Sequence, residues 1–172
     1  RKFARLMTNH NGYVLEQLYS PLVVIATPAL EVLRELGKGC VTRPTARHYL
    51  GFANGRRKRL AEPEPTVKHL LYAYRVLLTG IHLMQTGEVV ANLPVLNERF
   101  RDPVVEELMA RKRAGAEYML LGEHELADHV KRLAGLDEEL QRAQEASQLP
   151  EEPTTAAALD AFVVELRLRA AV

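Results

Sequence analysis

Six polar side chains recur at helical spacing in one stretch of the sequence: Lys68, Tyr72, Arg75, Thr79, His82 and Thr86. Steps of three or four residues place them on one stripe of an α-helix. Lysine and arginine donate hydrogen bonds to phosphate oxygens, and a tyrosine ring can stack on a base. Because residues 67–86 contain no aspartate or glutamate, the stripe favours contacts with phosphate, ribose and base.

Structural roles for the same residues remain open. Arg75 can pair with Glu16 or Glu88, Tyr72 can simply pack, and His82 can be a core histidine with its hydrogen bonds satisfied. The rest of this segment is largely apolar, which is typical of a buried helix. Its polar stripe must then face either solvent or a polar cleft.

The segment before this helix is basic and carries aromatic residues. No acid occurs between Glu35 and Glu62, and Tyr49 and Phe52 interleave with the cations. This combination is typical of nucleic-acid surfaces. The run 56–59 also fits a solvated helix end, where cations favour the helix dipole. The candidate nucleotide- or RNA-binding residues are Arg47, His48, Tyr49, Lys68, Tyr72, Arg75, Thr79 and His82.

The charges divide unevenly along the chain. Residues 1–60 hold 11 basic and 3 acidic residues, a net +8, whereas residues 61–172 hold 12 and 19, a net −7. A basic half indicates an anionic partner, such as nucleic acid, free phosphates or an acidic catalytic site. The alternative is that the two halves neutralise each other within one fold.

The elements that position these residues are mostly helices. Thr27-Pro28 and Asp102-Pro103 each predict a helix start, with a capping side chain before a proline. Periodicity predicts helices over 27–36, 44–60, 66–86, 102–113, 123–147 and 155–169, with short ones near 1–8 and 14–18. One β-branched run, 22–26, predicts a strand. We therefore expect a mainly α fold, with one helical region over 1–148 and a linker and helix over 149–172 that pack on the same domain.

Several classes of site and location are excluded or disfavoured. Cys40 is the single cysteine, so an intrachain disulfide and a multi-cysteine zinc site are excluded. The longest apolar run is about a quarter of a membrane span, so we expect no membrane partner and a cytoplasmic location.

Three sequence motifs carry a resemblance to a known family. They are residues 14–22 (VLEQLYSPL), 48–53 (HYLGFA) and 68–78 (KHLLYAYRVLL), followed by Thr79-Gly80 and the turn at 86–88. In this order and spacing they resemble the RNA repair pathway DNA polymerase beta family of nucleotidyltransferases. The similarity is good over residues 1–113 and looser beyond. His48, Tyr49, Lys68, Tyr72 and Arg75 match recurrent polar residues of that family.

The resemblance implies nucleotidyl transfer from an NTP with Mg²⁺, with RNA as a possible partner. It also implies an N-terminal catalytic α/β domain whose sheet the strand near 22–26 would complete. Such a domain supplies a Gly-Ser turn and paired carboxylates for two metal ions. This chain has no Gly-Ser dipeptide, and its acid-x-acid patterns at 62–64, 123–125 and 137–139 lie on no predicted strand. We therefore assign it no catalytic or metal-binding residue.

Two hypotheses follow from these observations. In the first, the chain supplies the nucleotide- and acceptor-binding helices of a nucleotidyltransferase whose catalytic part, and the Mg²⁺ it binds, lie outside it. The opening at Arg1, in the interior of a predicted helix, suits a chain cut from something longer. In the second, the chain is a non-catalytic helical module that binds RNA or protein through its basic half.

Overall fold

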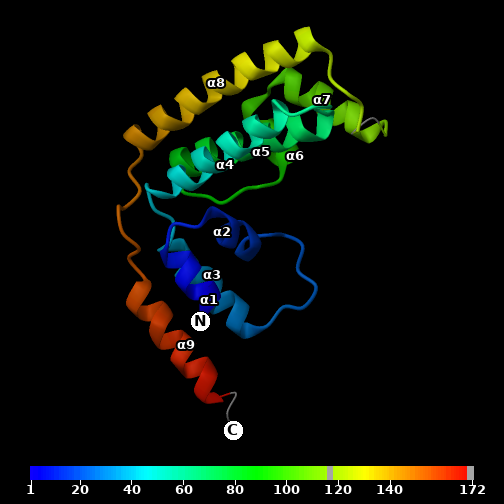
Figure 1. The fold of residues 1–172 in the computed structure, drawn as a ribbon. Helices are drawn as coiled ribbons and strands as arrows, with labels where there is room; N and C mark the ends of the chain where they lie inside the picture. Colours follow the sequence, from blue (N-terminus) through cyan, green and yellow to red (C-terminus); the bar gives the residue numbers. More distant parts are fainter. Residues whose placement is uncertain (116–117, 170–172) are drawn as a thin grey trace.

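Helices make up the regular structure of the computed structural model, which describes residues 1–115 and 118–169. Those residues contain the helices α1 (Lys2–Thr8), α2 (Gly12–Leu18), α3 (Pro28–Lys38), α4 (Thr45–Leu60), α5 (Val67–Thr86), α6 (Leu93–Phe100), α7 (Pro103–Arg113), α8 (Glu123–Ala146) and α9 (Ala156–Arg169). Helices α4 to α8 form an upper bundle, and α1, α2, α3 and α9 gather below it (Figure 1). The prediction of a mainly helical fold is confirmed.

Helix α5 forms the centre of the upper bundle. It packs against α4, α6, α7 and α8. The side chains of Tyr74, Leu77 and Ile81 are no more than 1% exposed. A helix of 20 residues is about 30 Å long, so α5 runs the length of the bundle and aligns the helices around it.

The ends of α5 lie where the sequence predicts them. The backbone N–H of Thr66 donates to Nδ1 of His69 at 3.2 Å, which completes a capping box at the N-terminus. Gly87 ends the helix with φ 75°, a left-handed conformation that glycine adopts without strain. The predicted N-caps at Thr27 and Asp102 are confirmed as well, since each side chain accepts a hydrogen bond from a backbone N–H of its helix.

The predicted strand at 22–26 is wrong for this structure. The segment is an irregular connection between α2 and α3, and Leu22, Val24 and Ile25 are 88%, 98% and 77% exposed. In the described residues the sole β-type pairing is an isolated bridge between Thr66 and Leu120. A β-branched run becomes a strand only when another strand pairs with it, and no neighbouring segment does so here.

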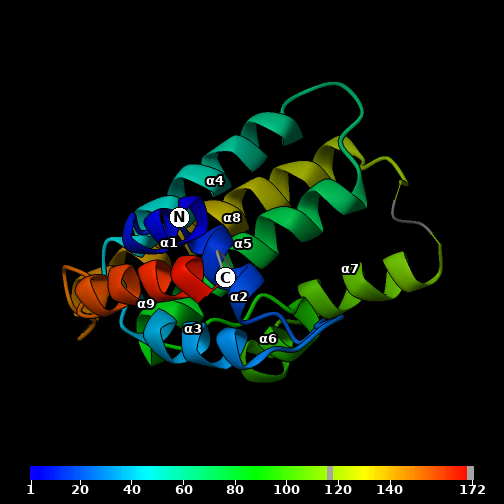
Figure 2. The ribbon, with the colours of Figure 1, turned by 90° about the horizontal axis from the view of Figure 1, so that it is seen from below.

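The C-terminal segment returns to the lower group of helices. Its linker is tied to the loop after α3, because the backbone N–H of Thr154 donates to Gly39 O and that of Arg43 donates to Pro150 O, both at 2.9 Å. Seen from below, α9 lies beside α1 and α3 (Figure 2). The division into 1–148 and 149–172 stays a prediction, and 170–172 fall outside the described residues.

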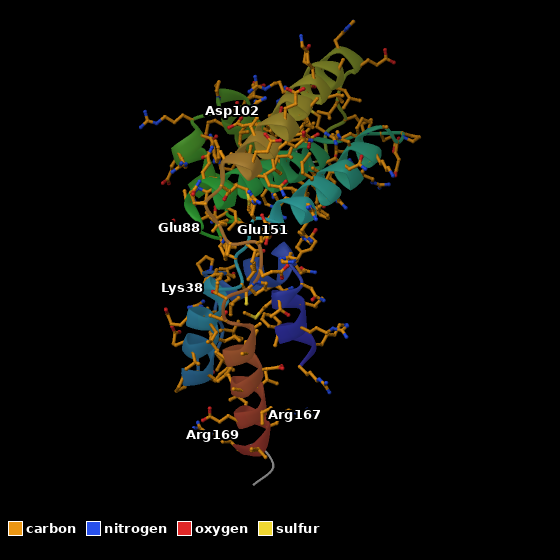
Figure 3. All side chains as sticks on the ribbon, turned by 90° about the vertical axis from the view of Figure 1, so that its left-hand side faces the viewer. Lys38, Glu88, Asp102, Glu151, Arg167 and Arg169 are labelled. Atoms are coloured by element: carbon orange, nitrogen blue, oxygen red, sulfur yellow. The ribbon has the colours of Figure 1, made fainter. Side chains whose placement is uncertain are left out.

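The two groups of helices lie end to end. Figure 3 shows Asp102 in the upper group, Arg167 and Arg169 near the far end of α9, and Glu151 where the groups meet. Helix α2 lies at this junction and contacts α4 of the upper bundle. This position brings residues of the first twenty beside the middle of α5.

Candidate functional site

A groove of about 600 Å³ opens beside the N-terminal half of α5. Tyr72, which is 42% exposed, and Arg75 line it from α5. The remaining lining residues come from α2, α5, α6 and α7: Glu16, Leu71, Leu93, Pro94, Met109, Lys112 and Arg113. The groove therefore combines an apolar wall with three cations and one carboxylate.

An ion pair fixes the arginine of this groove. Nη1 of Arg75 donates to Oε2 of Glu16 at 2.8 Å, and the two side chains are 19% and 11% exposed. The pair joins α2 to α5 across the junction of the two helix groups. Of the two acids considered as partners for Arg75, Glu16 is the one that the structure places beside it, while Glu88 lies 3.9 Å from His82.

Aromatic and basic side chains of α2 and α4 border the same ion pair. The ring of Tyr13 meets His48 edge-on at 5.1 Å and Phe52 at 4.9 Å between centroids. The guanidinium of Arg56 lies 4.6 Å from the Phe52 ring centroid. Burial lowers the pKa of His48, an effect that the nearby Glu16 carboxylate opposes. His48 is therefore held mainly neutral at pH 7, as a ring that packs against Tyr13.

Tyr49 lies behind the site rather than on its surface. It is 1% exposed, and burial, reinforced by Glu16, raises the pKa of its phenol well above the usual 10.0. Its ring packs on the backbone of Gly12, where an added Cβ would lie 2.7 Å from the ring. Tyr49 thus supports the contact between α2 and α4, and Gly12 is needed for that close approach.

Arg47 and Lys68 lie away from the groove, on two sides of it. Arg47 lines a separate polar hollow of about 500 Å³, together with Asn9, His10, Asn11, Pro44, His48, Glu151 and Glu152. Lys68, near the start of α5, donates to the hydroxyl of Tyr118 at 2.9 Å and lies 4.7 Å from the ring centroid. His48 alone among the predicted residues borders both the hollow and the Tyr13 ring.

Thr79 and His82 are in the core. Thr79 is fully buried, and its hydroxyl has no hydrogen-bond partner among the described residues. His82 is 8% exposed, and neither of its ring nitrogens has a hydrogen-bond partner among the described residues. Burial and the neighbouring Arg99 lower its pKa. The structure thus brings Tyr72 and Arg75 to the groove, buries Thr79 and His82, and leaves Thr86 exposed at the end of the helix.

Sequence reasoning missed the residues that α7 contributes to the groove. Lys112 and Arg113 belong to a basic run at the end of that helix, where cations usually complement the helix dipole. Their proximity to Tyr72 depends on how α7 packs on α5, and no spacing in the sequence encodes that packing. Tyr13 was missed for a similar reason, since only the packing of α2 on α4 brings it to His48 and Phe52.

The uneven charge of the two halves is partly cancelled by ion pairs between them. Arg43 pairs with Glu151, Arg57 pairs with Asp137, and in the opposite sense Glu16 pairs with Arg75. Ion pairs with acids of the second half therefore neutralise some of the positive charge of residues 1–60. Arg56 is stacked on Phe52 instead, which keeps its charge beside the Tyr13 ring.

The described residues do not fit a catalytic metal site. They contain no group of three or more His, Cys, Asp or Glu side chains that could hold a metal ion. The Mg²⁺ that the family resemblance implies thus has no ligand set in this part of the chain. In the same residues, every helix falls short of the length and apolar character needed to cross a membrane.

Fold and geometry together define a mainly helical protein with a cation-lined groove at the junction of two helix groups. The sequence profile of the RNA repair pathway DNA polymerase beta family matches residues 1–165, and the chain belongs to this family. The match confirms the resemblance carried by the three motifs and extends it beyond residue 113. No curated protein and no solved structure matches the chain.

Proposed function

We propose that this chain supplies the nucleotide-binding helices of a nucleotidyltransferase that acts in RNA repair. The observation that carries the proposal is the groove where Tyr72 and Arg75 of α5 meet Lys112 and Arg113 of α7. Among the described residues, Glu16 pairs with Arg75 inside the groove and Glu106 pairs with Arg113 at 2.7 Å from outside it. Three cations against these two carboxylates favour a ligand that carries phosphates. Family membership supports an NTP as that ligand.

The walls of the groove suit the rest of a nucleotide. Leu71, Leu93 and Met109 form an apolar side, and Tyr72 presents a partly exposed ring. A base can pack against such surfaces while its phosphates reach the cations. Glu16 holds Arg75 in place, so that the guanidinium is positioned before the ligand arrives.

Catalytic acids and Mg²⁺ would belong to an α/β part docked against these helices. An exposed apolar region supports this part of the proposal. It comprises the segment 22–26 and a second groove of about 440 Å³ lined by Tyr19, Leu22, Val89, Val90 and Val95, among others. Exposed apolar surface of this kind usually marks an interface. Glu16 lines both grooves, so a domain docked here would lie next to Arg75.

Titration of the full chain with ATP tests the nucleotide groove. Tyr72→Ala should weaken ATP binding about five- to tenfold, the equivalent of roughly 1 kcal/mol, while the melting temperature stays within about 2 °C. Arg113→Ala should have a similar effect. Arg142→Ala is the matched control, because Arg142 is an exposed arginine of α8 outside this groove. Equal ATP affinity in all four proteins would overturn the assignment of the groove.

A non-catalytic RNA- or protein-binding module remains the alternative function. The stacked Arg56 and the exposed basic end of α4 favour it. The two functions differ in nucleotide dependence: a module that binds only polymers would show no saturable ATP binding. Steep salt dependence of RNA binding without ATP binding would therefore favour the alternative.

A further inference from the structure

Four aromatic side chains and three cations lie in series on the surface next to the groove. We call this set the aromatic strip: Tyr13, Phe52, Tyr72 and Tyr118, with Arg56, Lys68 and Arg75. Tyr13, Tyr72 and Tyr118 are 37%, 42% and 67% exposed. Exposing large rings to water is unfavourable. A run of exposed rings beside cations therefore favours a ligand with flat apolar faces and negative charge.

Side-chain contacts connect neighbouring members of the strip. Lys68 donates to Tyr118 and lies over its ring, and Tyr72 follows Lys68 by one helical turn. The Arg75 guanidinium lies 6.0 Å from the Tyr72 ring centroid. On the other side of Arg75, Tyr13 contacts Phe52, over which Arg56 is stacked.

Electrostatic effects support the continuity of the strip. Burial raises the pKa of Tyr13, and Arg75 and Arg56 act in the opposite direction, which places both cations near its hydroxyl. Burial also lowers the pKa of His69, and the cations Arg59, Arg56 and Lys68 add to that shift. Among the described residues, two acids close to the strip are paired with cations, Glu16 with Arg75 and Glu62 with Arg59.

We propose that the aromatic strip binds a single-stranded polynucleotide, whose bases stack on the tyrosines while its phosphates contact Arg56, Lys68 and Arg75. Single strands expose base faces that a duplex hides, and aromatic platforms with cations are the usual surface for them. From Lys68 to Arg75 the helix rises about 10 Å, which matches about three stacked nucleotides at roughly 3.4 Å each.

This inference rests on the proposed function, because it assigns the acceptor of nucleotidyl transfer to the surface next to the NTP groove. Tyr72 and Arg75 belong to both surfaces, so a strand on the strip would end beside a nucleotide in the groove. The acceptor would then be the end of a single strand. Recognition through stacking and phosphates would also make the binding tolerant of base sequence.

Fluorescence anisotropy with labelled 12-nucleotide oligo(U) and oligo(dT), and with a 12-base-pair duplex, tests the strip in the full chain. We expect either single strand to bind more tightly than the duplex, with affinity that falls steeply with salt. Tyr118→Ala should weaken single-strand binding about five- to tenfold, the usual range for one lost stacking contact. The ratio of oligo(U) to oligo(dT) affinity measures the combined contribution of the 2′-hydroxyl and the thymine methyl group.

Leu168→Ala is the matched control, since Leu168 is also 67% exposed but lies on α9, far from the strip. Equal single-strand affinity in Tyr118→Ala and wild type would overturn the inference, as would duplex binding as tight as single-strand binding. Binding of an acidic polyglutamate peptide in place of either oligonucleotide would overturn it in favour of a protein partner.

The two proposals fail in distinguishable ways. Tyr118 does not line the NTP groove, so Tyr118→Ala should leave ATP affinity unchanged. ATP binding without single-strand binding would overturn the strip and leave the nucleotide groove standing. Single-strand binding that depends on Tyr118, in a protein that does not bind ATP, would overturn the groove alone and support the strip.

Discussion

In the N-terminal half of α5, Tyr72 is 42% exposed and Arg75 lines a groove, whereas in the C-terminal half Thr79 is fully buried and His82 is 8% exposed. The polar residues of both halves follow the same spacing of three or four residues. The surroundings differ, because α2, α6 and α7 leave a gap beside the first half. In the second half, Gly80 lies against Tyr49 of α4 and Leu140 of α8, which close over the helix.

The comparison shows that helical spacing determines which side chains share a face, while the packed neighbours determine whether that face reaches solvent. A polar stripe can therefore line a groove at one point and lie in the core at another. The first half has a groove beside its polar stripe, whereas Thr79 and His82 in the second half lie in the packed interior. This difference predicts large effects on stability in the second half and effects on binding in the first.

The largest effect should come from filling the tightest point of the second half. An added Cβ at Gly80 would lie 3.0 Å from Tyr49 Cβ and from a Leu140 methyl carbon. Gly80→Val adds two further methyl groups there, and overpacking of this kind should reduce the free energy of unfolding by about 3 kcal/mol. Urea denaturation followed by circular dichroism measures the loss.

Gly51→Ala is the control for glycine substitution in a helix. No atom lies within 4 Å of a Cβ added at Gly51, so alanine should stabilise α4 by about 0.5–1 kcal/mol through helix propensity. If Gly80→Val were as stable as wild type, the C-terminal half of α5 would have more free space than this packing allows, and the contrast between the halves would weaken.

A smaller loss is expected at the boundary between the halves. Arg75→Ala leaves Glu16, which is 11% exposed, without its cation. We expect a loss of about 2 kcal/mol in the free energy of unfolding, because a largely buried carboxylate is costly without a partner. The double variant Arg75→Ala/Glu16→Gln should recover part of this loss. A loss equal in the single and double variants would show that the ion pair does not stabilise the junction.

Much of the fold was predictable from the sequence because its signals are local. The caps at Thr27 and Asp102 depend on residues within one turn of the helix end, and both are confirmed. The segment 22–26 forms no strand in this structure, since β-propensity reports what a segment does when a strand is beside it. That it completes a sheet outside this chain stays a prediction. No local signal shows whether that strand exists.

The groove was only partly predictable, because some of its residues are brought together by tertiary packing. Tyr72 and Arg75 share a helix face that spacing reveals, but Lys112 and Arg113 reach them through the packing of α7 on α5. The burial of Thr79 and His82 likewise depends on tertiary packing, which spacing does not reveal. Spacing correctly predicted that these residues share one helix. Which of them line the groove depends on tertiary contacts.

A smaller effect than those at Gly80 and Arg75 should come from His82, and it should be a gain in stability rather than a loss. Both ring nitrogens are buried without a hydrogen-bond partner among the described residues, although Glu88 lies 3.9 Å from Nε2. Replacing such a group with an apolar one of similar size removes its desolvation cost. His82→Leu should therefore stabilise the protein by about 1 kcal/mol at pH 7, as measured by urea denaturation.

The gain from His82→Leu should also depend on pH. Burial and Arg99 lower the pKa of His82 in the folded protein, so below a pH of about 6.5 the unfolded chain takes up a proton that the folded chain does not. The free energy of unfolding of the wild type thus falls as the pH drops from 6.5, and the advantage of the variant grows. His48, His69 and His129 shift in the same direction, so the variant keeps part of the slope. A constant advantage between pH 7.5 and pH 5 would mean that His82 is protonated equally in both states, and that the C-terminal half of α5 is more open to solvent than its burial indicates.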